Sequence, residues 1–239
     1  MSAVRALLDA LFPLGHEVAV EGRLVHGTAR SAVAERVEIV GTADAAAVDA
    51  TLALGMAGRI LRALEGPPCP LVFLVDTSGQ ALLRHEELLG LNAYLAHLAS
   101  TVDVARRNGY PSVSIVYGQA VSGGYLSLGL MANRAYALAD AQIRVMDLHA
   151  MARVTKLPYE QLASLAKESP VFAPGAGNYE RMGGLAAIWP EPTAARMDEA
   201  LREVLSGDAA DDGRLSAGLQ RGGRTRGLPT AQAVLRALP

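Results

Sequence analysis

The chain has 239 residues, 51% of them hydrophobic and 19% charged, which is enough to bury a full core in a globular protein. Its formal net charge of −2 argues against a nucleic-acid-binding protein, which usually carries a strongly basic surface. No segment approaches the ~20 apolar residues that span a bilayer, and no apolar run of signal-peptide length stands at the N-terminus, so we expect a cytoplasmic protein without a membrane partner.

Hydrophobic periodicity predicts an α/β fold. A helix is expected over residues 4–11, then paired strands at 18–25 and 34–39, and then a helix that begins at an N-cap Asp44 and ends near Leu64. Strands and helices then alternate, and we expect strands at 71–75, 112–117, 134–138 and 142–146 and helices at 86–107 and 123–132. Because such units form right-handed crossovers, the sheet should be largely parallel, and the early strand pair makes it mixed.

The last third of the chain is expected to be mainly helical. The pattern predicts helices at 148–154, 158–168, 178–183, 193–205 and 229–238, a loop at 170–178 and a short strand at 188–189. Residues 206–227 are polar and rich in glycine, which indicates an exposed connection. The sequence therefore predicts a main domain, residues 1–205, and a C-terminal extension, residues 206–239.

The stretch Tyr117-Gly-Gln-Ala-Val-Ser-Gly-Gly-Tyr125 follows the apolar run 113–116 and leads into a helical pattern at 126–131, which together predict a strand, a glycine turn and a helix. Gly123 and Gly124 lack side chains, so a ligand can approach their backbone closely. The unpaired N–H groups at a helix start carry positive partial charge and suit a developing oxyanion, such as that of a thioester enolate. The alternative is a tight turn in which glycine only allows the helix to pack closely.

A second stretch has the same design, because the buried strand 71–75 leads into Asp76-Thr-Ser-Gly-Gln80. The carboxyl ends of strands in an α/β fold converge on one crevice, so Gly79 and the 123–124 pair could each supply one N–H to a single oxygen. Asp76 and Asp140 also stand at strand ends. Each carboxylate is a general base in one interpretation and a turn cap or arginine partner in the other.

Several other side chains have two interpretations. Ser122 is a nucleophile, or else a helix N-cap or pocket hydroxyl; the second is favoured because the Gly-x-Ser-x-Gly elbow is absent. Tyr117 and Tyr125 flank the glycine turn as packing residues or as proton donors.

The histidines show no metal-binding spacing, so no metal is expected, and His85 and His149 either border a pocket or are solvated. Cys69 is the single cysteine, so an intrachain disulfide is excluded, and we expect an inert buried thiol at this position.

The ordered set of motifs resembles the carboxyltransferase branch of the crotonase superfamily, and in detail the malonate decarboxylase gamma subunits. The resemblance is carried by residues 73–79, 117–125, 139–146, 170–175, 179–185 and 220–224. It implies a ClpP/crotonase-like repeated β-β-α superhelix with C-terminal helices. The sequence departs from the related biotin carboxyltransferases at Ser78-Gly79, where those proteins carry Pro-Gly. The resemblance therefore does not predict the conformation of this loop.

The resemblance also implies a function. A malonyl thioester on an acyl carrier protein would lose carbon dioxide through an oxyanion-stabilised enolate and become an acetyl thioester. By position, Gly79, Gly123 and Gly124 match the oxyanion donors, with Ser78 and Ser122 lining the pocket and Tyr117 and Tyr125 beside it. No cofactor is expected on the chain itself; the implied group is the carrier's phosphopantetheine-type arm, phosphoribosyl-dephospho-CoA.

The implied partners are a homologous beta subunit in a heterodimer or larger assembly, the acyl carrier protein subunit and an acyl-carrier transferase subunit. Two alternatives stay open. The chain could belong to a carboxyltransferase that passes the carboxyl group to biotin, or it could be a non-catalytic subunit that stabilises its partner.

Overall fold

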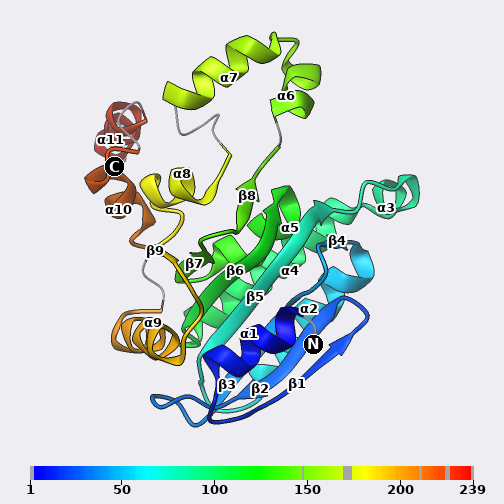
Figure 1. Cartoon of the computed structure of the whole chain (residues 1–239), viewed down its shortest axis with the longest axis vertical. Coiled ribbons are helices and arrows are strands. Elements are labelled where there is room, and N and C mark those ends of the chain that lie inside the picture. Colours follow the sequence, from blue (N-terminus) through cyan, green and yellow to red (C-terminus); the bar gives the residue numbers. More distant parts are fainter. Residues whose placement is uncertain (1–2, 147, 169–173, 210–211, 224–226, 238–239) are drawn as a thin grey trace.

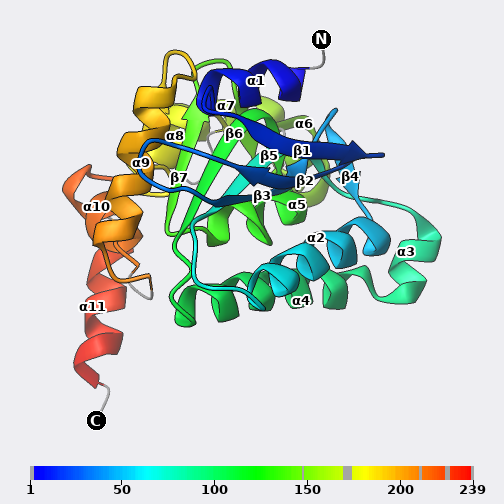
Figure 2. The same cartoon turned by 90° about the horizontal axis from the view of Figure 1, so that it is seen from below.

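The computed structural model describes residues 3–146, 148–168, 174–209, 212–223 and 227–237. It has the predicted α/β architecture, in which a mixed, mostly parallel sheet lies between helices on its two faces (Figures 1 and 2). No helix among these residues is long and apolar enough to cross a membrane. The loop predicted over 170–178 lies partly outside the described residues.

The N-terminal region begins with the predicted helix, α1 (Ala3–Leu11), but the predicted pair of strands is wrong. The chain forms three antiparallel strands here, β1 (His16–Glu21), β2 (Leu24–Ala29) and β3 (Val37–Thr42). The alternating pattern over 18–25 hides a tight turn at Gly22, whose φ of +61° is a conformation that glycine adopts without strain.

The predicted start of the next helix is also wrong. A short strand, β4 (Ala46–Val48), follows the turn at Asp44, and α2 (Ala50–Ala63) begins after it. Asp49 is the N-cap, because its Oδ1 accepts the Leu52 N–H at 2.7 Å. Both aspartates are typical N-cap residues, so composition alone could not choose between them. The helix ends next to Leu64, as predicted.

Two central strands continue beyond their predicted ends. β5 (Leu71–Gln80) and β6 (Ser112–Val121) each contain ten residues, and their polar ends, expected to be loops, remain in the sheet. The end of β5 pairs with β4, and the end of β6 pairs with β8 (Gln142–Arg144). Hydrogen bonds from the short strands β4 and β8 keep the ends of β5 and β6 in the sheet, although the composition of these ends is typical of a turn.

Two helices that the sequence predicts as continuous are each divided in the structure. Gly90, with φ +74°, separates α3 (Arg84–Leu89) from α4 (Leu91–Arg107). The helix expected over 123–132 is split into α5 (Ser122–Leu126) and a 3-10 turn, η1 (Gly129–Met131).

The sheet order is β1-β2-β3-β5-β6-β7-β9, with β7 (Arg134–Leu138) and β9 (Ala187–Trp189) at the far end. All pairs from β3 onward are parallel, so the ends of β5 and β6 lie at one edge. Successive side chains of β5 point to opposite faces. Leu71 and Phe73 pack with α2 and α4, while Val72 and Leu74 pack with α1 and α9 (Ala194–Ser206).

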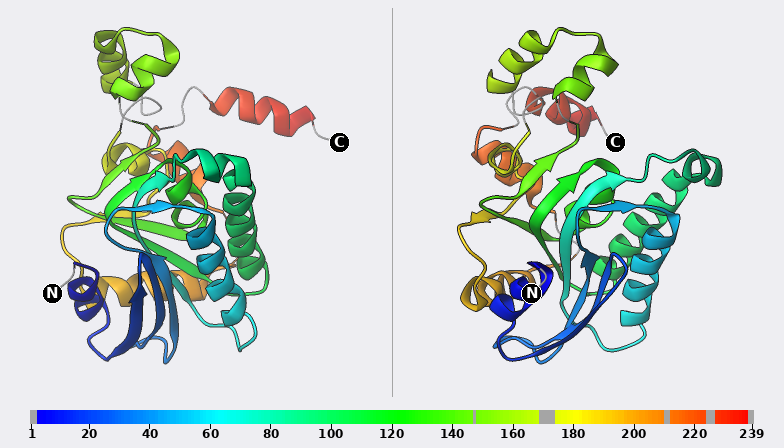
Figure 3. Two further views of the ribbon diagram at one scale, coloured as in Figure 1. Left: turned by 90° about the vertical axis from the view of Figure 1, so that its right-hand side faces the viewer. Right: turned by 45° about the vertical axis from the view of Figure 1, so that its right-hand side comes forward.

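The C-terminal third is helical, as predicted. Helices α6 (Leu148–Thr155), α7 (Tyr159–Glu168) and α8 (Ala176–Arg181) lie near their expected positions, with α6 and α7 together at one end of the molecule (Figure 1). The exposed connection predicted over 206–227 is wrong in part, because α10 (Arg214–Gln220) forms there and packs on α8. Helix α11 (Leu228–Ala237) projects from the body (Figure 3). The division at residue 205 stays a prediction.

Candidate functional site

The two glycine-bearing segments meet at the carboxyl edge of the sheet. Gly79 lies near the end of β5 with φ +105°, and Gly124 is the third residue of α5. A Cβ added to Gly124 would stand 2.6 Å from Thr77 Oγ1 and 3.1 Å from the Gly79 carbonyl oxygen. The predicted juxtaposition is therefore present, and close packing alone already demands glycine at position 124.

Two of the three N–H groups predicted to bind an oxyanion have partners within the chain. The Gly79 N–H donates to Thr77 Oγ1 at 3.0 Å, and the Gly123 N–H donates to the side-chain oxygen of Gln80 at 3.1 Å. The Thr77 hydroxyl in turn donates to the Ala46 carbonyl oxygen at 2.6 Å. An anionic oxygen would have to replace the Gln80 amide at Gly123. Sequence reasoning missed Gln80, because its role depends on the continuation of β5 through residue 80.

Ser78 precedes Gly79 on β5, and Ser122 stands two residues before Gly124 on α5. Ser78 is exposed on β5, whereas Ser122 is half-buried and is the first residue of α5. The N-cap interpretation of Ser122 is wrong, because Val121 occupies the cap position and no side chain bonds the first turn. Ser122 has a φ of +45°, a left-handed conformation that is uncommon for a residue with a side chain.

The two tyrosines that flank the turn point into the protein. The Tyr117 hydroxyl donates to the Thr42 carbonyl oxygen at 2.8 Å. Tyr125 is 1% exposed and packs edge-on against Tyr179, with ring centroids 6.2 Å apart. Burial raises the pKa of both phenols, for Tyr117 with a further contribution from the Asp76 carboxylate. These positions support the packing interpretation over proton donation.

Asp76 ties together the strand ends that form the site. Its Oδ1 accepts the Gln119 N–H and its Oδ2 accepts the Ala45 N–H, both at 2.8 Å. The carboxylate lies against Gly118, where an added Cβ would stand 2.4 Å from Oδ1. Asp76 therefore bridges the β3–β4 turn and β6, which supports the turn-capping interpretation. Asp140, by contrast, is exposed.

The remaining candidates have local partners. His85 pairs with Glu86 at 3.1 Å and is 67% exposed at its side chain, and His149 stacks on Tyr159 with centroids 4.3 Å apart. Burial raises the pKa of the Cys69 thiol, in agreement with an inert role. Among the described residues, no group of three or more histidine, cysteine, aspartate or glutamate side chains could hold a metal ion.

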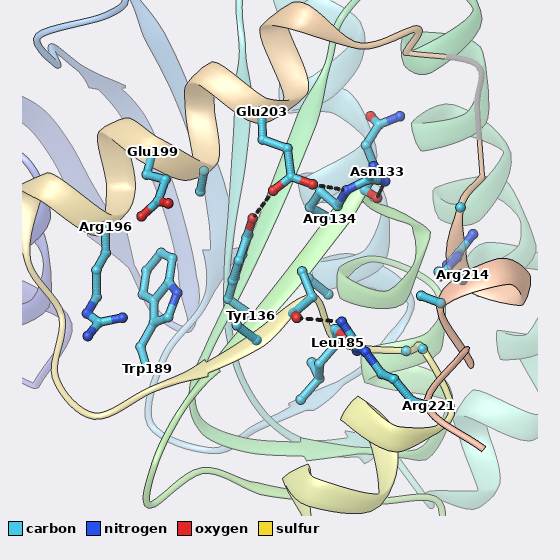
Figure 4. A pocket seen from close by; sticks show the side chains of 18 residues that line it. Asn133, Arg134, Tyr136, Leu185, Trp189, Arg196, Glu199, Glu203, Arg214 and Arg221 are labelled. Atoms are coloured by element: carbon cyan, nitrogen blue, oxygen red, sulfur yellow. Dashed lines mark hydrogen bonds and ion pairs between the residues drawn. The ribbon is translucent and has the colours of Figure 1, made fainter. Parts of the chain in front are cut away.

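A cavity of about 470 Å³ lies elsewhere, between the β7–β9 edge, α9 and α10 (Figure 4). Glu203 accepts hydrogen bonds there from Arg134 at 2.6 Å and from the Tyr136 hydroxyl at 2.8 Å. Burial opposes ionisation of Glu203, but these bonds outweigh it and lower its pKa. Arg221 donates to three main-chain carbonyl oxygens, those of residues 180, 185 and 186. This network joins α9, the β7–β9 edge and α10, so it has a structural explanation.

With this geometry established, the comparison with known proteins decides the family. Residues 43–238 match the family described as malonate decarboxylase gamma subunit. The chain belongs to this family. As a gamma-subunit family member it has the predicted crotonase-like fold, which is shared with more distant carboxyltransferases such as transcarboxylase 12S, at 21% identity and a TM-score of 0.69 over 85% of the chain and 41% of that chain.

Three relatives are informative. The malonyl-S-ACP:biotin-protein carboxyltransferase MADD of Malonomonas rubra is 34% identical over 167 residues, 65% of this chain, and the match spans 57% of that relative's length. A Pseudomonas malonate decarboxylase hetero-tetramer in complex with coenzyme A is similar with a TM-score of 0.80 and 28% identity, over 97% of this chain and 100% of that one. The Pseudomonas MdcD–MdcE hetero-dimer matches with a TM-score of 0.78 and 26% identity, over 99% of each chain.

Proposed function

We propose that this gamma-subunit family member acts with a homologous beta subunit to decarboxylate a malonyl thioester carried on an acyl carrier protein. The products are an acetyl thioester and carbon dioxide. The observation that carries the proposal is the contact between Gly79 on β5 and Gly124 on α5, which brings two glycine-bearing backbone segments to one point at the sheet edge.

The chemistry explains why such a site needs no acid–base pair. When the carboxylate leaves as carbon dioxide, the bonding electrons move into the thioester carbonyl and form an enolate. Donors aimed at that oxygen lower the barrier, and the loss of one donor typically costs about 3 kcal/mol. In this proposal the Gly124 and Gly123 N–H groups face the enolate oxygen once the Gln80 amide has moved aside, with Gly79 opposite and Ser78 and Ser122 at the rim.

The carrier's phosphopantetheine-type arm would bring the acyl group to this place. Leu82 and Leu83 follow the site directly and are 81% and 52% exposed, an apolar surface that fits the hydrocarbon part of such an arm. The arm supplies the thioester sulfur when bound. An acyl-carrier transferase would load the carrier, and the proposed compartment is the cytoplasm, where the carrier and its transferase would meet the enzyme.

A second function has a specific observation in its favour. The Malonomonas rubra relative is named for carboxyl transfer from a malonyl carrier to a biotin protein. The same enolate would form in both cases, and only the acceptor of the carboxyl group differs. The alternative of a purely stabilising subunit is favoured by the internal partners of the Gly79 and Gly123 N–H groups.

Reconstitution with the beta, carrier and transferase subunits tests these functions together. We expect carbon dioxide release from malonyl carrier that avidin does not inhibit, and co-elution of this chain with the beta subunit. Inhibition by avidin would establish biotin as the carboxyl acceptor. A chain that stays monomeric beside the beta subunit, with decarboxylation by the beta subunit alone, would contradict the proposal.

The Ser122 hydroxyl is expected to contribute little to turnover. A covalent mechanism needs an activated hydroxyl beside a base, whereas a pocket hydroxyl contributes about 1 kcal/mol. Ser122→Ala in the assembled complex should keep activity within about tenfold of the wild type, measured as carbon dioxide release. Loss of several orders of magnitude, together with serine labelling by a fluorophosphonate probe, would instead establish a nucleophile.

A further inference from the structure

Beside the glycine segments lies one guanidinium group with no carboxylate partner among the described residues. Arg144 is the last residue of β8, and the parallel register pairs it with Val121, immediately before Ser122. Neighbouring strands lie about 4.8 Å apart, so the Arg144 main chain is one strand spacing from the start of the candidate site. Figure 1 shows β8 beside the end of β6 that leads into α5.

The direction of the Arg144 side chain follows from the sheet. Ala120 and Ile143 are paired in register, and both are buried in the core with Tyr125. Because successive residues alternate between faces, Val121 and Arg144 point to the opposite face. Val121 also borders Gly79, where an added Cβ would stand 3.5 Å from Val121 Cγ1. The half-buried Arg144 therefore shares a face with the residue that touches Gly79.

The partners of Arg144 hold it in place without neutralising it. One of its terminal nitrogens donates to the Gln119 side-chain oxygen at 3.0 Å. The Gln119 N–H is fixed in turn by the Asp76 carboxylate at 2.8 Å. This acceptor is a neutral amide, and among the described residues no ion pair with a carboxylate involves Arg144, so in this part of the chain its positive charge is available to an anionic ligand. A planar guanidinium can bind a carboxylate through two parallel hydrogen bonds.

We propose that Arg144 is a specificity-determining residue that binds the free carboxylate of the malonyl group, with Gln119 and Asp76 as positioning residues. This inference rests on the proposed function. The contact favours the malonyl over the acetyl thioester, because the product has lost the group that Arg144 binds. In this arrangement Arg144 binds the carboxylate while the thioester oxygen lies at Gly124. No covalent bond to Arg144 forms or breaks.

The charge of the acyl group separates this role from a structural one. The probes are acetyl-pantetheine and sulfoacetyl-pantetheine, in which a sulfonate replaces the carboxylate and cannot leave as carbon dioxide. Binding to the complex with the beta subunit is measured by calorimetry. We expect wild type to bind the sulfonate probe more tightly, and Arg144→Gln to lose about 10- to 100-fold in that affinity while its acetyl probe affinity stays unchanged. Arg144→Lys should keep part of the preference.

The control is Arg62→Gln, which removes the same charge from an exposed position on α2 and should leave both affinities unchanged. Equal preference for the sulfonate probe in wild type and Arg144→Gln would overturn the role of Arg144. If the same complexes still release carbon dioxide, the proposed function would stand. Equal loss of both probes in Arg144→Gln would mean that the residue supports only the fold. A wild-type complex that binds neither probe and releases no carbon dioxide would refute the proposed function itself.

Discussion

Gly124→Val should reduce decarboxylation by the assembled complex on the order of 100-fold or more. Even the first added carbon would stand 2.6 Å from Thr77 Oγ1 and 3.1 Å from the Gly79 backbone, so α5 must move away from β5. That movement separates the backbone groups proposed to bind the enolate oxygen, and the valine methyl groups fill the remaining space. The measurement is carbon dioxide release at saturating malonyl carrier.

The control is Gly58→Val, because Gly58 also lies in a helix and an added Cβ there meets no atom within 4 Å. We expect both variants to co-elute with the beta subunit, since the change at Gly124 is confined to the contact between α5 and β5. Near-normal turnover of an assembled Gly124→Val complex would remove Gly124 from the site. Failure of only this variant to assemble would mean that the contact serves the fold.

Much of this architecture could be predicted from sequence, because it depends on patterns within single segments. The apolar runs 71–75 and 113–116 predicted the two central strands, and the glycine-bearing segments that follow these runs predicted that the strand ends meet at one edge. Pattern reasoning failed where partners distant in sequence decide the structure. The polar end of β5 stays in the sheet because β4 pairs with it, and no local signal marks the three residues of β4 as a strand.

In the candidate site, too, some features follow from local sequence patterns and others depend on partners that are distant in sequence. The contact between Gly79 and Gly124 was predictable, since Gly79 stands near the end of β5 and Gly124 follows the end of β6, and the two strands end at one edge. The partners of the N–H groups were not, because Gln80 reaches Gly123 only in the observed register of β5 beside β6. Asp76 was recognised as a strand-end carboxylate, but its bridge from Ala45 to Gln119 joins residues 74 positions apart, and only the fold brings them together.

Gly118→Ala should destabilise the protein strongly, although alanine is the smallest change available. The new Cβ would stand 2.4 Å from Asp76 Oδ1 and 2.6 Å from its Cγ, so the carboxylate has to move. The half-buried Ala45 and Gln119 N–H groups then lose their acceptor, and an unsatisfied donor costs up to about 1–3 kcal/mol, depending on its burial. We expect the free energy of unfolding in urea to fall by about 3 kcal/mol, against little change for Gly58→Ala on α2.

A double-mutant cycle identifies the cause. In an Asp76→Ala background the carboxylate is absent, so Gly118→Ala should cost less than about 1 kcal/mol more, and the two changes should be strongly non-additive. Additive costs would place the strain elsewhere than in the contact between Gly118 and Asp76. The cycle also bears on function, because Gln119 connects the Asp76 carboxylate to Arg144. Gly118→Ala should therefore weaken the preference for the sulfonate probe even where the complex still assembles, since a displaced Gln119 no longer holds the guanidinium beside the site.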